Sequence, residues 1–218
     1  MLRNLPWVGL CVALVCGAAP ASAATCAPPT LLHIITVDVT PGITSQMFAA
    51  QPKGLYRIGS DKMRVEEAPD PANGIHGLVV VAEPNIWMAN LLDNTGKHIV
   101  DPGPTFFVKA PVFGIAGLSP RLLDLELGCE AAYLAANAPK AVRSEQLGGA
   151  AYLVYRVDDN PDAVEILEKS GSNTPAFARY FHQGKLELVL RYDLYSTGLQ
   201  SNPDLFTPPS SVHFSETK

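Results

Sequence analysis

Short runs of alternating apolar and polar residues, separated by turn-forming residues, recur along most of the chain. The clearest run is residues 185–195, in which every second residue from Leu186 to Leu194 is apolar or aromatic. An alternation with a period of two predicts a half-buried β-strand. The turn at Gln183-Gly184 joins this run to residues 176–182 and predicts a hairpin. A chain made mostly of such hairpins favours a mainly β fold over a helical bundle.

The same signals predict further strands at residues 31–40, 54–58, 62–67, 75–82, 85–92, 97–100, 150–158 and 163–169. Residues 122–138 are the best helix candidate, because apolar residues recur there at helical spacing and Pro139 ends the run. Gly128 interrupts this pattern, which favours a helix that starts after it. The polar, proline-rich tail from Ser196 carries no predicted element. We therefore expect eight to ten strands in meander order, forming one curved antiparallel sheet with one or two helices against one face.

The first 23 residues have the features of a cleaved signal peptide. Arg3 precedes an apolar run that ends near Ala19, and Ala21 and Ala23 occupy the two small-residue positions of a cleavage site. The run is short for a membrane-spanning helix, although an uncleaved anchor is the alternative. We expect residues 1–23 to direct export and residues 24–218 to form one domain in the periplasm.

Removal of the first 23 residues leaves two cysteines, Cys26 and Cys129. An exported chain with two cysteines favours one disulfide, which would join the start of the domain to its middle. Two separate buried thiols are the alternative. Neither cysteine belongs to a C-x-x-C pattern, so we expect no metal or redox site from this pair.

Several classes of function lack support in the sequence. The net charge of −5 and the absence of a Lys/Arg cluster argue against a nucleic-acid partner. The five histidines do not show the spacing of a zinc motif, and the chain has neither a G-x-S-x-G motif nor a glycine-rich phosphate loop. We expect no catalytic residue, no metal and no cofactor.

Three segments, at residues 55–66, 85–90 and 205–212, together resemble the LolA/LolB-like lipoprotein-localisation superfamily. They read LYRIGSDKMRVE, NIWMAN and LFTPPSSV. The resemblance implies an incomplete β-barrel, closed on one side by helices, with an apolar cavity for acyl chains. Lipoprotein carriers of this kind tend to have an arginine in the turn of the first segment, where this chain has Gly59 between Arg57 and Arg64. The resemblance therefore implies a distant member with a ligand of its own.

A hydrophobic ligand needs a concave apolar surface that the core leaves unfilled. We expect such a surface to be lined by Trp87, Met88, Phe106, Phe107 and Phe181. The alternative is that these side chains are packed core residues. The predicted function is a monomeric periplasmic carrier or binding protein for an acyl chain, a lipid or a lipidated protein. The two alternatives are a cell-envelope interaction protein with a filled core and an enzyme that uses the cavity without a cofactor.

Overall fold

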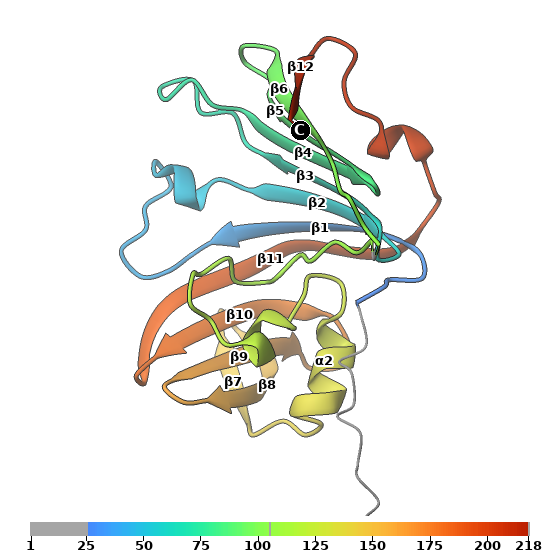
Figure 1. Ribbon diagram of the computed structural model, residues 1–218. Helices are drawn as coiled ribbons and strands as arrows, with labels where there is room; N and C mark the ends of the chain where they lie inside the picture. The colour runs from blue at the N-terminus through green and yellow to red at the C-terminus, as the bar shows by residue number, and fades with distance from the viewer. Residues whose placement is uncertain (1–25, 105, 218) are drawn as a thin grey trace, which may run out of the picture.

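A single large β-sheet dominates the molecule. The computed structural model describes residues 26–104 and 106–217, so the predicted signal peptide lies outside the described residues. Twelve strands form one curved sheet that does not close into a barrel, because its two edges, β7 and β12, remain apart (Figure 1). The predicted mainly β fold, a curved sheet forming an incomplete barrel with few helices, is confirmed.

The strands are β1 (Leu31–Asp38), β2 (Lys53–Ile58), β3 (Lys62–Glu67), β4 (Gly77–Ala82), β5 (Asn85–Asn90), β6 (Thr95–Val100), β7 (Arg143–Leu147), β8 (Ala150–Asp159), β9 (Asp162–Lys169), β10 (Pro175–His182), β11 (Lys185–Leu199) and β12 (His213–Thr217). Two α-helices, α1 (Pro120–Leu123) and α2 (Glu130–Asn137), lie between β6 and β7. Two short 3₁₀ helices are η1 (Phe48–Ala50) and η2 (Pro203–Phe206).

Two antiparallel meanders make up the sheet. Strands β1–β6 form one meander and β7–β11 form the other. They meet in the middle of the sheet, where β1 pairs with the long strand β11. The hairpin turns read from the sequence therefore fall between neighbouring strands, as the local turn chemistry predicts.

Two strands were not predicted, and one pairing is not antiparallel. The expected count of eight to ten omitted β7 and β12. Strand β12 pairs with β6 in parallel, so the predicted all-antiparallel meander is wrong at this edge. The tail returns to the sheet because Phe206 and Val212 are buried, and η2 contacts β3 and β4. A parallel return across more than a hundred residues leaves no local turn signal.

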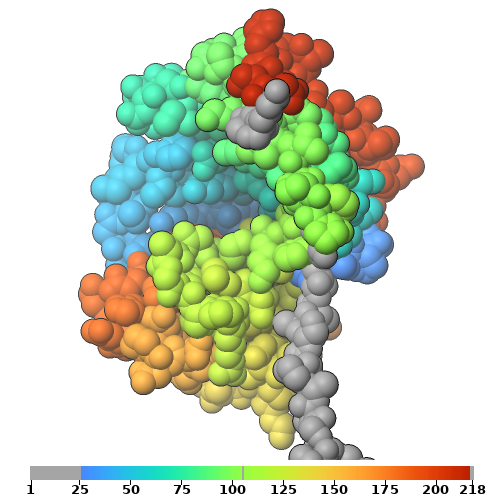
Figure 2. Space-filling model, viewed as in Figure 1, coloured from blue at the N-terminus to red at the C-terminus, as the bar shows by residue number. Residues whose placement is uncertain are grey.

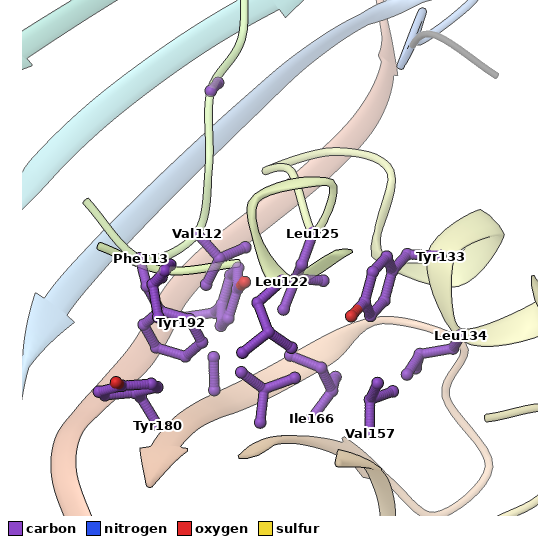
Figure 3. Close-up of a cluster of buried hydrophobic side chains, with 14 of the residues drawn as sticks. Val112, Phe113, Leu122, Leu125, Tyr133, Leu134, Val157, Ile166, Tyr180 and Tyr192 are labelled. Carbon is purple, nitrogen blue, oxygen red and sulfur yellow. The ribbon is translucent and has the colours of Figure 1, made fainter. Parts of the chain in front are cut away.

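The segment between β6 and β7 covers one end of the concave face of the sheet. We call residues 106–138 the covering segment. It contributes Phe113, Leu122, Leu125 and Leu134 to a core that includes Ile166 on the sheet (Figure 3). The covering segment lies across the β8–β11 meander, where its loops and α2 are seen in front of the strands in Figure 1. The helical cover expected from the sequence is therefore present over half of the sheet.

Helix α2 starts where the sequence predicts. Gly128 has a φ of +92°, and a Cβ atom at this position would collide with the side chain of Leu32. Glycine adopts this backbone conformation without strain, which ends the preceding loop and lets the helix begin at Glu130. The predicted disulfide is also present: Cys26 and Cys129 are bonded, with their Cα atoms 5.8 Å apart. It fastens the segment before β1 to the start of α2.

Candidate functional site: an apolar trough on the concave face

One row of side chains runs across the first meander on its concave face. The strand registers place Ile34, Leu55, Val65, Val79 and Met88 opposite one another, from β1 to β5. Directly paired residues in a sheet point to the same face, so these five side chains form a continuous apolar row. The next member of the row, on β6, is charged.

A cavity lies where this row passes beneath the covering segment. It has a volume of about 450 Å³ and is walled mainly by aliphatic side chains. The sheet, the covering segment and β11 contribute these apolar lining residues: Ile34, Leu55, Met63, Val65, Val112, Ile115, Leu127, Leu188 and Leu190. Figure 2 shows the surface hollowed between the blue strands and the green covering segment. This size is within the usual range for small-molecule sites.

A second, shallower hollow of about 680 Å³ extends over β3–β6. Val65 lines both the cavity and this hollow, so we call the two together the trough. No part of the covering segment lines the hollow, and Met88 and Ile75 in it are 47% and 44% exposed. The trough is therefore roofed at one end and open at the other.

A buried arginine fixes the roof to the sheet. The Arg57 side chain is fully buried and donates hydrogen bonds to the backbone carbonyls of Val108 (2.8 Å) and Leu127 (3.2 Å). It also pairs with Glu126 at 2.9 Å, and a Glu126 oxygen accepts the Ala110 N–H at 3.0 Å. These bonds hold the backbone on both sides of the roof loop. Charge-assisted bonds of this kind are stronger than neutral ones, and losing one partner leaves a buried charge without compensation.

The charged groups around the trough are mostly paired. Lys53 lies 3.5 Å from Glu67, and Lys109 lies 2.9 Å from Asp124. Lys97, which continues the apolar row onto β6, makes no ion pair with any residue that the structure describes. The open end of the trough therefore has one cation without a carboxylate partner.

A separate polar cluster lies beneath α2. The Glu130 carboxylate is fully buried and accepts hydrogen bonds from the hydroxyls of Tyr192 (3.0 Å) and Tyr195 (2.8 Å) and from the Gly128 N–H (2.9 Å). Burial raises the pKa of Glu130 from its ordinary value of 4.5 to about 7, despite these donors. Neither Glu130 nor the two tyrosines line the trough.

The five residues predicted to line a cavity do not come together. Met88 lines the open hollow. Trp87 is its neighbour on β5, so it points to the opposite face, where its ring stacks on His98 with centroids 5.2 Å apart. Phe181 lies beneath the Arg156 guanidinium, 5.2 Å from the ring centroid. Phe106 and Phe107 are 42% and 44% exposed on the covering segment.

Sequence reasoning missed most of the trough lining because it selected aromatic residues. The apolar lining is largely aliphatic, and much of it comes from alternate positions of neighbouring strands, such as Leu55, Val65 and Val79. The strand-phase signal was available: Leu55 shares a face with Arg57, while Met63 and Val65 share a face on the next strand. Extending this alternation across the neighbouring strands would have predicted the row of apolar side chains that lines the trough. The partner of Arg57 is 69 residues away and has no local signal.

Two further classes of site are absent from the part of the chain that the structure describes. Within residues 26–104 and 106–217, no group of three or more His, Cys, Asp and Glu residues could hold a metal ion. Within the same ranges, no helix is long and apolar enough to cross a membrane.

Comparisons with known proteins give only distant similarities. No protein-family model matches the chain, and no curated protein matches it. The chain is similar to the structure of a conserved, uncharacterized protein from Thermus thermophilus, with 10% identity over 89% of this chain and 93% of that chain and a TM-score of 0.49. It is also similar to MucB, with 13% identity over 87% of this chain and 61% of that chain and a TM-score of 0.46.

A third similar structure is the Pseudomonas aeruginosa MucA/MucB complex, with 14% identity over 84% of this chain and a TM-score of 0.44. The chain spans 57% of the length of that matched chain. Similarities at this level carry no argument about function, and the LolA/LolB-like resemblance stays a prediction.

Proposed function

We propose that this protein binds an apolar ligand, such as an acyl chain or a lipid, in the trough, and that it does so in the periplasm as a carrier or binding protein. The observation that carries the proposal is the roofed cavity of about 450 Å³, whose aliphatic walls continue into an open apolar hollow. Burial of apolar ligand surface against these walls would supply most of the binding free energy.

Exposure of the trough supports a ligand rather than a packing role. The aliphatic row stays apolar across β3–β5, yet the covering segment does not reach it. A ligand lying along this row would remove its apolar surface from water. The periplasmic part of the proposal rests on the predicted signal peptide and on the Cys26–Cys129 disulfide, which forms in oxidising compartments.

The direct test is native mass spectrometry of the protein purified from the periplasm without detergent, followed by organic extraction of any adduct. We expect an adduct of lipid mass on the wild-type protein. Val65→Trp should remove it, because Val65 lines both parts of the trough. Val142→Trp is the matched control, since Val142 is exposed and lies outside the trough. A bare wild-type mass, or an adduct that Val65→Trp retains while folded, would contradict the proposal.

The enzyme alternative predicts a buried polar cluster with shifted pKa values at the floor of the cavity. A cluster of this kind exists around Glu130, but it lies beneath α2 and not in the trough. A substrate in the trough would not contact it. The observed geometry therefore favours binding over catalysis.

A protein partner is the second candidate. The observation in its favour is the pair Phe106 and Phe107, two adjacent and exposed aromatic residues on the covering segment. Exposed aromatic residues are frequent anchors of protein interfaces. Photocrosslinking from position 107 in the periplasm would capture such a partner. Unchanged lipid adducts in a Phe107→Ala variant would separate this role from ligand binding.

A further inference from the structure

The two ends of the trough differ in enclosure, because the covering segment lines only one of them. At the roofed end, aliphatic side chains of the sheet and the covering segment form most of the wall, and Asp38, Lys53 and Lys109 also line it. At the open end, the polar groups of Asn90, Thr95, Lys97 and Ser215 join the apolar floor. The charged groups of the roofed end are already bonded within the protein, Lys53 to Glu67, Lys109 to Asp124 and Asp38 to Thr40. The open end leaves room for a polar head group that stays in contact with water.

One row of directly paired residues connects the two ends across the strands. The path runs from Val65 on β3 through Val79 and Met88 to Lys97 on β6. Three strand spacings separate its ends, which is about 14 Å along the sheet. A ligand that follows this path must be long and narrow, with its tail under the roof and its head over β6.

Charge distinguishes Lys97 from the other lysines of the trough. Lys53 and Lys109 each have a carboxylate within 4 Å, Glu67 and Asp124 respectively. Among the described residues, Lys97 has none, and the acidic residue of the open hollow, Glu67, is the one that pairs with Lys53. Lys97 is therefore available to a negative group on a ligand.

From this arrangement we infer that the ligand is a single-chain amphiphile with an anionic head, represented in the test by a carboxylate, and that it is bound with its chain beneath the covering segment and its head at Lys97. The inference rests on the proposed function, because it takes ligand binding in the trough as given. It assigns an orientation and a head-group charge to that ligand. An ion pair at a partly exposed site contributes up to about 1 kcal/mol, so the carboxylate should strengthen binding about fivefold over a neutral head.

The test compares three probes of equal chain length by titration calorimetry, below the concentrations at which they form micelles: palmitate, hexadecanol and hexadecyltrimethylammonium. We expect palmitate to bind about fivefold more tightly than hexadecanol, and the cation to bind more weakly than both. Lys97→Met should remove the preference for palmitate over hexadecanol. Lys62→Met, which changes an exposed lysine that does not line the trough, is the matched control.

The outcomes separate this inference from the proposed function. Equal binding of palmitate and hexadecanol would overturn the anionic head and leave the apolar trough in place. A palmitate preference that survives Lys97→Met would place the head elsewhere and overturn the orientation. If none of the three probes binds, the proposed function itself fails. Loss of the preference in Lys97→Met but not in Lys62→Met is the result that supports the inference.

Discussion

The two halves of the sheet both have an apolar concave face, but the covering segment packs on only one of them. Over β8–β11, the covering segment fills the concavity, and Val157, Ile166 and Ala178 are almost fully buried beneath it. Over β3–β6, the concave face carries an open hollow, in which Met88 is 47% exposed. No residue of the covering segment, residues 106–138, lines this hollow. The filled half therefore provides most of the core of the fold, while the open half leaves apolar side chains exposed.

The covering segment connects the two halves of the molecule. The roof of the cavity belongs to the same segment that fills the other half, and Arg57 anchors it to β2. Changes that loosen the covering segment should therefore affect both stability and the cavity. Changes confined to the open hollow should affect ligand binding alone. The following predictions test this division, from the largest expected effect to the smallest.

Removal of the disulfide should be the most damaging change. The Cys26–Cys129 bond closes a loop with a sequence separation of 103 residues. In the chain-entropy model, opening a loop of this length lowers the free energy of unfolding by about 5 kcal/mol. Urea unfolding of the double Cys→Ser variant and of the wild-type protein measures this loss in the free energy of unfolding. A loss below about 1 kcal/mol would show that the covering segment is held by packing alone.

Loss of Arg57 should be nearly as severe. Arg57→Met leaves the buried Glu126 carboxylate without its cation, which should cost about 4 kcal/mol of stability. Adding Glu126→Gln removes the uncompensated charge, so the double variant should be more stable than Arg57→Met alone. Both are measured by chemical denaturation. A double variant as unstable as the single one would assign the loss to the backbone hydrogen bonds of Arg57 rather than to the ion pair.

Matched truncations compare the two halves directly. Leu122→Ala removes a fully buried side chain from the filled half and should lower the free energy of unfolding by roughly 3–4 kcal/mol. Met88→Ala, in the open hollow, should change it by less than about 0.5 kcal/mol. Thermal unfolding of both variants gives the comparison. Similar losses from the two truncations would contradict the division into a filled and an open half.

Stability should depend on pH through Glu130. Its folded-state pKa is raised from 4.5 to about 7, so the unfolded chain loses this proton first as the pH rises. The contribution of Glu130 to stability should therefore be highest below pH 4.5, fall by about 3 kcal/mol between pH 4.5 and pH 7, and then level off. Glu130→Gln should remove this component from the pH profile of the unfolding free energy. Glu187→Gln, at an exposed position on β11, should leave the profile unchanged.

Local features of the sequence predicted the parts of the fold that depend on neighbouring residues. Turn residues located the hairpins, and Gly128 located the start of α2. The two remaining cysteines predicted their bond. Strand β12 was missed because its partner β6 lies more than a hundred residues earlier and runs in parallel. A pairing of that kind is set by the burial of Phe206 and Val212, which no short pattern in the tail indicates.

The candidate site was predicted as an apolar surface, but its residues were mostly different ones. Choosing both Trp87 and Met88 ignored the alternation of a strand, which sends neighbours to opposite faces. The ion pair of Arg57 with Glu126 joins two segments 69 residues apart. It could be recognised only once the covering segment had been placed on the sheet.

The most direct test of the two-halves account is methyl NMR during titration with palmitate. The trough methyl groups of Ile34, Leu55 and Val65 should shift as the ligand binds. Those of Leu122, Leu125 and Ile166 in the filled half should stay in place, because these side chains are fully buried and do not line the trough. Shifts confined to the first set are the predicted result. Shifts centred on the second set, or no shifts in either, would contradict the claim that the trough is the binding site.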